Sequence, residues 1–91
     1  IGLRYRDIKA IKSIIDKIKL MLLYHSAVDH QLNTDVFFTN FGPSTLDIEI
    51  SAYISKMGDI SFPVVRQELL LKIANIIMEE GAEIATPTNI V

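Results

Sequence analysis

Between residues 46 and 55, apolar and polar side chains alternate without interruption. The apolar positions are Leu46, Ile48, Ile50, Ala52 and Ile54, and the positions between them hold Asp47, Glu49, Ser51, Tyr53 and Ser55. Because successive side chains of a strand point to opposite faces, this pattern predicts a strand with one dry and one wet face. Such a strand requires a second layer of structure to cover its apolar side.

Two amphipathic segments are suited to form that layer. In residues 8–25 the apolar positions recur at helical spacing, at Ile8, Ile11, Ile15, Ile18 and Leu22, with Ile14 and Met21 widening the stripe. The opposite face carries Lys9, Lys12, Asp16, Lys17 and Lys19. We therefore predict a helix here, with Asp7 as its N-cap. The stripe lasts less than three heptads, which favours a helix packed on a sheet over a coiled coil.

The second predicted helix begins near Ser61, a capping residue, with Pro63 in its first turn, where a missing N–H is tolerated. Its expected buried stripe consists of Val65, Leu69, Ile73, Ile76 and Ile77, with Leu70 at the edge. Gly81 is the expected helix stop.

Three further short strands are predicted, over residues 1–5, 36–41 and 82–85. The aromatic strand 36–41 is expected to be buried on much of both faces, and Gly42-Pro43-Ser44 to turn the chain after it. The order is βαββαβ. It predicts a single α+β domain over residues 1–91, a ferredoxin-like sandwich with two helices on one face of a four-stranded antiparallel sheet.

Cysteine content, the length of apolar runs and net charge limit the classes of function that this chain can have. The chain has no cysteine, and its longest apolar run, residues 20–24, is far shorter than the ~20 residues of a membrane-spanning helix. The net charge of −2 argues against a dedicated nucleic-acid binder. Charge is uneven: residues 1–19 carry six bases against two acids, and the remainder three bases against nine acids. We interpret the basic stretch as a solvated helix face.

Catalytic and metal-binding chemistry is not predicted. His25 and His30 stand near Asp29 and Asp35, but their spacing in a loop matches no known metal-ligand pattern. Asp47 and Glu49 share one strand face without a neighbouring histidine or cysteine. We therefore expect no catalytic, cofactor or metal site, and no enzyme.

Two other functions are known for this fold. RNA-binding domains stack bases on strand aromatics, for which Phe37, Phe38, Phe41 and Tyr53 are the candidates, but Asp47 and Glu49 would repel phosphate. A small-molecule-binding regulatory module of the ACT type is the stronger alternative. Such modules bind an amino acid near a glycine-containing first strand–helix loop, whereas residues 4–7 contain no glycine.

Several segments together resemble one family, the C-terminal cytoplasmic αβ domain of small-conductance mechanosensitive channels (MscS). They are Leu3-Arg-Tyr-Arg6, Val36-Phe-Phe-Thr-Asn-Phe-Gly-Pro-Ser-Thr-Leu-Asp-Ile48, Arg66-Gln-Glu-Leu-Leu-Leu-Lys-Ile73 and Glu79-Glu-Gly-Ala-Glu-Ile-Ala-Thr-Pro-Thr88. The last departs mildly from the family's Gly-Ile-Glu-Phe-Ala-x-Pro-Thr, since Ala82 and Ile84 replace isoleucine and phenylalanine.

The resemblance implies a fragment of a longer membrane protein, and both ends of the chain look cut. It implies a homo-oligomer, a heptamer in the full-length protein, in which this domain builds part of a hollow cage on the cytoplasmic side of the inner membrane. Such a channel opens under membrane tension and releases small solutes in hypo-osmotic shock. Residues 36–41 offer more apolar surface than a thin core needs, which favours contacts between copies. We expect the isolated fragment to associate only weakly.

Overall fold

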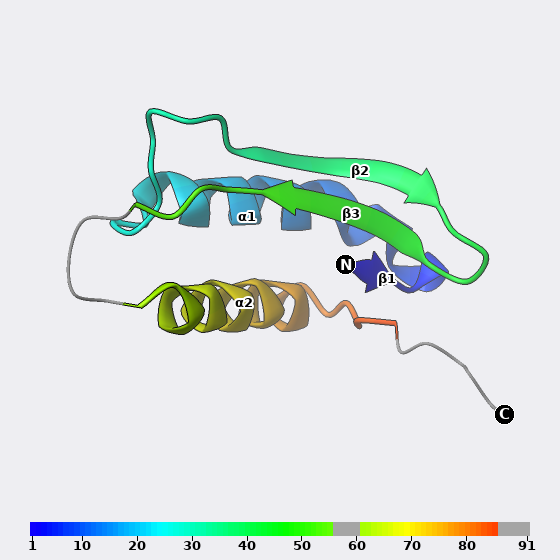
Figure 1. The fold of residues 1–91 in the computed structure, drawn as a ribbon. Coiled ribbons are helices and arrows are strands. Elements are labelled where there is room, and N and C mark those ends of the chain that lie inside the picture. The colour runs from blue at the N-terminus through cyan, green and yellow to red at the C-terminus, as the bar shows by residue number, and fades with distance from the viewer. Residues whose placement is uncertain (56–60, 86–91) are drawn as a thin grey trace, which may run out of the picture.

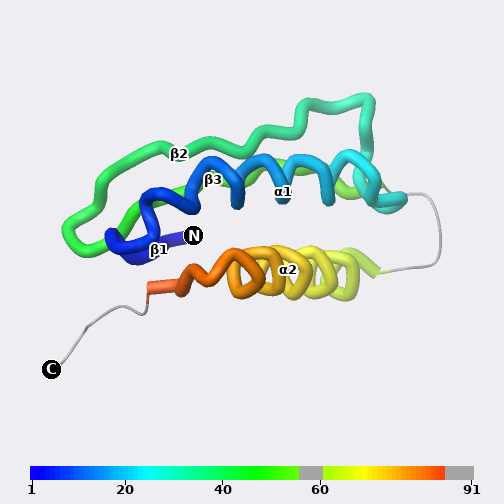
Figure 2. The backbone as a smooth tube through the Cα atoms, turned by 180° about the vertical axis from the view of Figure 1, so that it is seen from behind, coloured from blue at the N-terminus to red at the C-terminus, as the bar shows by residue number. Residues whose placement is uncertain are grey.

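The structure is a computed structural model that describes residues 1–55 and 61–85. Its elements, in chain order, are β1 (Gly2–Leu3), the 3₁₀ helix η1 (Tyr5–Ala10), α1 (Ile11–Tyr24), β2 (Asp35–Phe41), β3 (Leu46–Ser51) and α2 (Phe62–Glu79). Figure 1 shows α1 running along the sheet, while α2 lies beside α1, on the side of the molecule away from β2. Figure 2 shows the same arrangement from behind.

The strands form a three-stranded antiparallel sheet in the order β1-β3-β2. Residues 82–85, predicted as a fourth strand, lie at the outer edge of β1 but make only a single bridge, between Leu3 and Ile84. Ala85 N–H donates to the Gly2 carbonyl at 2.9 Å. The α+β class is therefore confirmed, whereas the described residues do not form the four-stranded sandwich. The reason is that β1 spans only two residues and offers a short edge for pairing.

The first helix starts differently from the prediction. Its first turns, Tyr5–Ala10, are a 3₁₀ helix, and the α-helix proper spans Ile11–Tyr24. Arg4 holds the N-cap position, so the assignment of Asp7 as the cap was wrong. The Asp7 carboxylate instead accepts a hydrogen bond from Glu83 N–H at 2.9 Å, which ties the start of this helix to the segment after α2.

The second helix ends as predicted. Gly81 has a φ of +73°, its N–H donates to the Met78 carbonyl, and Ala82 N–H donates to the Ile77 carbonyl. This is the Schellman arrangement, which favours glycine because the left-handed conformation strains any other residue. At the other end Ser61 occupies the N-cap position, but its side chain makes no capping hydrogen bond.

One continuous core lies between the sheet and the helices. Its buried members are Leu3, Ile11, Ile14, Ile18, Leu22, Val28, Val36, Leu46, Ile48, Val65, Leu69, Ile73, Ile77 and Ala82. Most of both predicted stripes is buried, but Ile8 is 47% exposed because it belongs to the 3₁₀ turn, and Ile15 and Ile76 are half-buried. Within the described ranges, no helix is both long and apolar enough to span a membrane.

The prediction that strand 36–41 is buried on both faces was wrong. Only Val36 is fully buried, and Phe38 is half-buried against the core. Phe37 and Phe41 are 55% and 63% exposed. The cause is the position of β2 at the edge of the sheet, where α1 covers one face only.

Candidate functional site

The two histidines have structural partners. His25 follows α1, where its Nδ1 accepts the Ala27 N–H at 3.1 Å and its Nε2 lies 3.3 Å from Glu68 Oε1 on α2. His30 Nε2 lies 3.1 Å from the Leu22 carbonyl oxygen, which can only accept, so this nitrogen donates. Over residues 1–55 and 61–85, no three histidine or acidic side chains gather closely enough to hold a metal ion.

The two carboxylates of β3 do not act as a pair. Asp47 accepts hydrogen bonds from the Thr45 hydroxyl at 2.6 Å and from the Asn40 amide at 3.3 Å. These bonds, that from Thr45 first, hold the pKa of Asp47 below its usual value. Glu49 is exposed and lies opposite Phe37 on β2. Asp47 is therefore an ionised acceptor that stabilises the β2–β3 turn, and it has no free proton to transfer near pH 7.

The β2–β3 turn also contacts η1 through Tyr5. The Tyr5 hydroxyl donates to the Gly42 carbonyl, and the Tyr5 ring stacks on Phe41 at 6.4 Å between centroids. A side chain at Gly42 would collide with Thr45, whose Oγ1 would lie 2.6 Å from the added Cβ. The sequence around Gly42 therefore forms a tight turn, and the Tyr5 side chain stabilises this turn.

The strand aromatics do not form a continuous row. Phe37 and Phe38 are consecutive and point to opposite faces, and Phe38 packs edge-on against Phe41 at 5.0 Å. A base-stacking platform needs its rings on one accessible face. This geometry therefore provides no argument for RNA binding.

Three exposed aromatic side chains lie on the edge strand β2 or stack against it. Tyr5, Phe37 and Phe41 are 43%, 55% and 63% exposed, and we call them the aromatic edge. Lys19 Nζ on α1 lies 5.8 Å from the centre of the Phe37 ring, where a cation–π contact is favourable. Large exposed aromatic groups of this kind are typical of contact surfaces.

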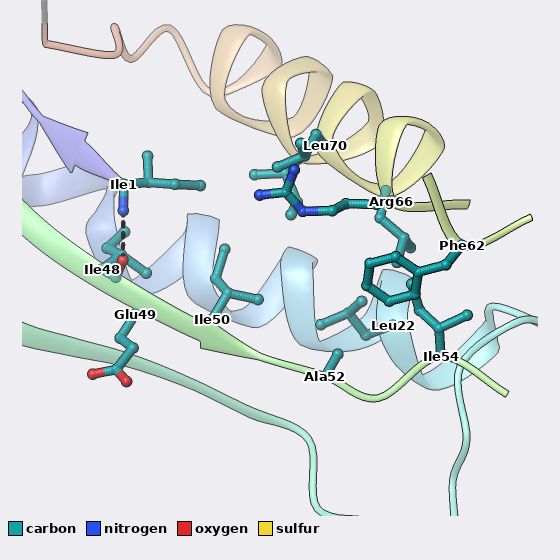
Figure 3. A pocket seen from close by; sticks show the side chains of 12 residues that line it. Ile1, Leu22, Ile48, Glu49, Ile50, Ala52, Ile54, Phe62, Arg66 and Leu70 are labelled. Atoms are coloured by element: carbon teal, nitrogen blue, oxygen red, sulfur yellow. Dashed lines mark hydrogen bonds between the residues drawn. The ribbon is translucent and has the colours of Figure 1, made fainter. Parts of the chain in front are cut away.

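A second apolar surface is an open groove between β3 and α2, with a volume of about 530 Å³. We call it the β3–α2 groove, and Figure 3 shows its lining. Its apolar lining includes Ile1, Ile50, Ala52, Ile54, Phe62, Leu69, Leu70 and Ile73. The sequence analysis did not predict this groove. Two features of the sequence pointed to it: the apolar positions of the 46–55 alternation continue past the residues that pair with β1, and Leu70 lies at the edge of the apolar stripe of α2.

Ion pairs connect α1 and the first residues of the chain to the segment that follows α2. Lys17 on α1 forms an ion pair with Glu80, which follows α2. The hydrogen bond between the two side chains raises the pKa of Lys17 and lowers the pKa of Glu80. A hydrogen bond from the Ser13 side chain lowers the pKa of Glu80 further. Glu83 contacts both Arg4 and Arg6 at 2.8 Å. The basic face predicted to be merely solvated is thus partly engaged with the acidic segment after α2.

Comparison with known proteins supports a single family. Residues 1–84 match the family described as "Mechanosensitive ion channel MscS, C-terminal". The chain is 31% identical over 88 residues to the low conductance mechanosensitive channel YnaI of Escherichia coli (strain K12), covering 97% of this chain and 26% of YnaI. The cryo-EM structure of wild-type AtMSL1 is similar over 94% of this chain and 30% of that one, with 25% identity and a TM-score of 0.82.

The chain thus spans between a quarter and a third of the length of these relatives. The match covers β1 to the segment after α2, including the turn and the helix stop described above. The structure of AtMSL1 has the same fold over 94% of this chain, and the relative YnaI is named as a channel. The chain therefore belongs to the family of C-terminal domains of MscS mechanosensitive ion channels.

Proposed function

We propose that this chain is the C-terminal, cytoplasmic domain of a mechanosensitive channel in the inner membrane, which opens under tension and releases small solutes in hypo-osmotic shock. The observation that carries the proposal is the family match over residues 1–84. The match to YnaI supports it, because it extends over 97% of this chain.

Within that channel, the domain's task is assembly. The titratable side chains of the candidate sites are hydrogen-bonded in the turn, at the end of α1 and between the helices, which supports a structural role for them. Two of the surfaces that expose apolar groups are the aromatic edge and the β3–α2 groove. We propose that copies of the domain pack side by side in a heptamer and form the wall of a cage.

The alternative, an ACT-like amino-acid-binding module, has less support. Its binding loop would lie between β1 and the first helix, where Arg4 alone separates β1 from η1. Thermal denaturation in the presence of each amino acid distinguishes the two proposals. A ligand that binds only the folded state raises the melting temperature, so a saturable rise would favour the ACT-like function.

The channel function is tested by producing the full-length protein in a bacterial strain without mechanosensitive channels of its own. Suction on excised membrane patches should open a conductance that is missing from patches with the empty vector. The same cells should survive a sudden drop in osmolarity. Protein that reaches the membrane intact but gives no tension-activated conductance would contradict the proposal.

Assembly is tested separately, by the mass of the purified full-length protein in detergent. We expect seven copies, and Phe37→Glu with Phe41→Glu should weaken that assembly because charge would enter an apolar contact. Glu49→Gln, an exposed change on the neighbouring strand, is the matched control. The isolated fragment should sediment mainly as a monomer at micromolar concentration, since it lacks the tethering of the whole protein.

A further inference from the structure

The pairing of β1 with β3 reaches the first residue of the chain. Ile48 N–H donates to the Ile1 carbonyl at 2.8 Å, and the Ile1 nitrogen donates to the Ile48 carbonyl at 2.9 Å. This exchange of both bonds is a complete hydrogen-bonded pair of an antiparallel ladder. The register places Gly2 opposite Asp47 and Leu3 opposite Leu46, so Ile1 continues the same ladder.

Beyond Ile48, β3 continues while β1 does not. Backbone groups of a strand point alternately to its two sides, so those of Ile50 point to the same side as those of Ile48. On the other side β3 pairs with β2, and after β3 the Tyr53 carbonyl accepts from Asp29 N–H and Ser55 N–H donates to the Ala27 carbonyl. Within the described residues, the β1 side of β3 is therefore paired only as far as Ile48.

The β3–α2 groove lies along this open side. Its floor is formed by Ile50, Ala52 and Ile54, and its wall by Phe62, Leu69 and Ile73 of α2. Ile1 stands at one end of the groove, in line with it, as Figure 3 shows. An edge with unpaired N–H and C=O groups beside an apolar groove is suited to an added strand.

We propose that the residues immediately before Ile1 in the full-length chain extend β1 along β3 and fill the β3–α2 groove. Continuing the register places the second residue before Ile1 opposite Ile50 and the fourth opposite Ala52. The side chains of these two residues face the groove, and apolar residues are expected there. The first and third residues face the outer surface beside Glu49 and Ser51.

Continuity of the chain favours this occupant over a strand from a second copy. A segment joined to Ile1 is held at the mouth of the groove, and its effective concentration there far exceeds that of a separate molecule. The family to which the chain belongs is described as C-terminal, and the match covers 26% of YnaI, so a preceding segment is expected. A packed strand, unlike a flexible linker, fixes the orientation of this domain to the rest of the protein.

Cysteine cross-linking in the full-length chain tests the register. The first residue before Ile1 and Glu49 would form a non-hydrogen-bonded pair with Cα atoms ~4.5 Å apart, within disulfide range. Both positions are changed to cysteine in a background without other cysteines, and the protein is oxidised with copper phenanthroline. Mass spectrometry then identifies the linked peptides, and a non-reducing gel separates links within a chain from links between chains.

Two control pairs bracket the result. Phe37→Cys with Glu49→Cys joins established partners on β2 and β3, and it should cross-link readily. Glu49→Cys with cysteine at the second residue before Ile1 should link at least tenfold more slowly, because the two side chains point to opposite faces.

We expect the test pair to link within one chain at a rate within about threefold of the Phe37–Glu49 control. A link between chains would show that a neighbouring copy fills the groove, and it would overturn the proposal. No link in the test pair, while the control links, would overturn it as well. Cross-linking does not require ion conduction, so this experiment tests the added strand independently of the proposed channel function.

Discussion

The two helices carry similar apolar stripes but differ in how well they are covered. On α1 the buried residues Ile11, Ile14, Ile18 and Leu22 are at most 5% exposed. The stripe of α2 is also buried, with Leu69 the most exposed at 8%. Outside the stripes, α1 exposes Leu20, Leu23 and Tyr24 only near its C-terminal end, whereas α2 exposes apolar residues along its whole length, namely Phe62, Val64, Leu70, Leu71 and Met78. The reason is position: α1 packs against both β2 and α2, whereas the main partner of α2 is α1.

This difference shows that an apolar stripe identifies the residues that need covering, but not what covers them. Where the described chain does not cover an apolar surface, as along the β3–α2 groove, the cover has to come from elsewhere in the assembly or the chain. The following predictions test the difference between the two helices.

The largest expected effect compares the same substitution on the two helices. Ile14→Ala removes a fully buried side chain from α1 and should lower the free energy of unfolding by about 4 kcal/mol, within the usual range for such cavities. Ile73→Ala on α2 should lower it by only about 2 kcal/mol, because the vacated space adjoins the open groove.

Urea denaturation of both variants measures this difference. Equal losses would show that α2 is as well covered as α1 in the isolated domain. If a preceding strand fills the groove, the loss for Ile73→Ala should increase when the chain is extended before Ile1.

A smaller effect is expected where α2 ends. Gly81→Ala should lower the stability by about 1 kcal/mol, because the residue has a φ of +73° and any side chain is strained there. No atom lies within 4 Å of the added Cβ, so crowding does not contribute. Gly81→Asn is the control and should recover part of the loss, since asparagine tolerates this conformation better. A loss as large for asparagine as for alanine would contradict this explanation.

The ion pair between the helices should make stability depend on pH. The pKa of Glu80 is lowered and that of Lys17 is raised, so the pair stabilises the fold between these values. The contribution is lost as the pH falls below the ordinary glutamate value of 4.5, and again as it rises above the ordinary lysine value of 10.5.

Lys17→Gln should therefore lower the urea midpoint at pH 7 and lower it less at pH 3, where Glu80 begins to be protonated. Lys12→Gln is the matched control on the same helix, because Lys12 is 92% exposed and lies 3.9 Å from Asp16. An equal effect of the two variants at pH 7 would mean that the pair with Glu80 does not link the helices.

The smallest effect is expected on the outer face of the sheet. Glu49→Ala should change the free energy of unfolding by less than about 0.5 kcal/mol, because the side chain is exposed on the polar face of β3. Leu69→Ala, on the buried face of α2, should give a loss of about 2 kcal/mol in the same urea experiment. Similar midpoints for the two variants would mean that the faces are assigned incorrectly.

Much of the architecture was predictable because it depends on local periodicity and on turn residues. The alternation of residues 46–55 correctly predicted β3 and its start, but the strand ends at Ser51, beyond which Ile54 forms only an isolated bridge with Val28. The spacing of Val65, Leu69, Ile73 and Ile77 correctly predicted the buried face of α2. The helix stop at Gly81 followed from the conformational freedom of glycine alone. The segments that resembled MscS channels also led to the family that the comparisons support.

Other features depended on which elements lie next to each other. The exposure of Phe37 follows from the edge position of β2, and the segment 82–85 failed to form a strand because β1 is so short. No local pattern states how far two strands overlap or which side of a helix remains uncovered.

By itself, then, the sequence determined the class of fold, the type of each main element and the family, since these depend on side-chain period, on turn residues and on motifs. Only the tertiary structure decided the three-stranded sheet, the role of Asp47 in its turn, the link between Lys17 and Glu80 and the open groove beside β3. These features join residues far apart in the chain, and their energies depend on the distance and burial that only packing creates.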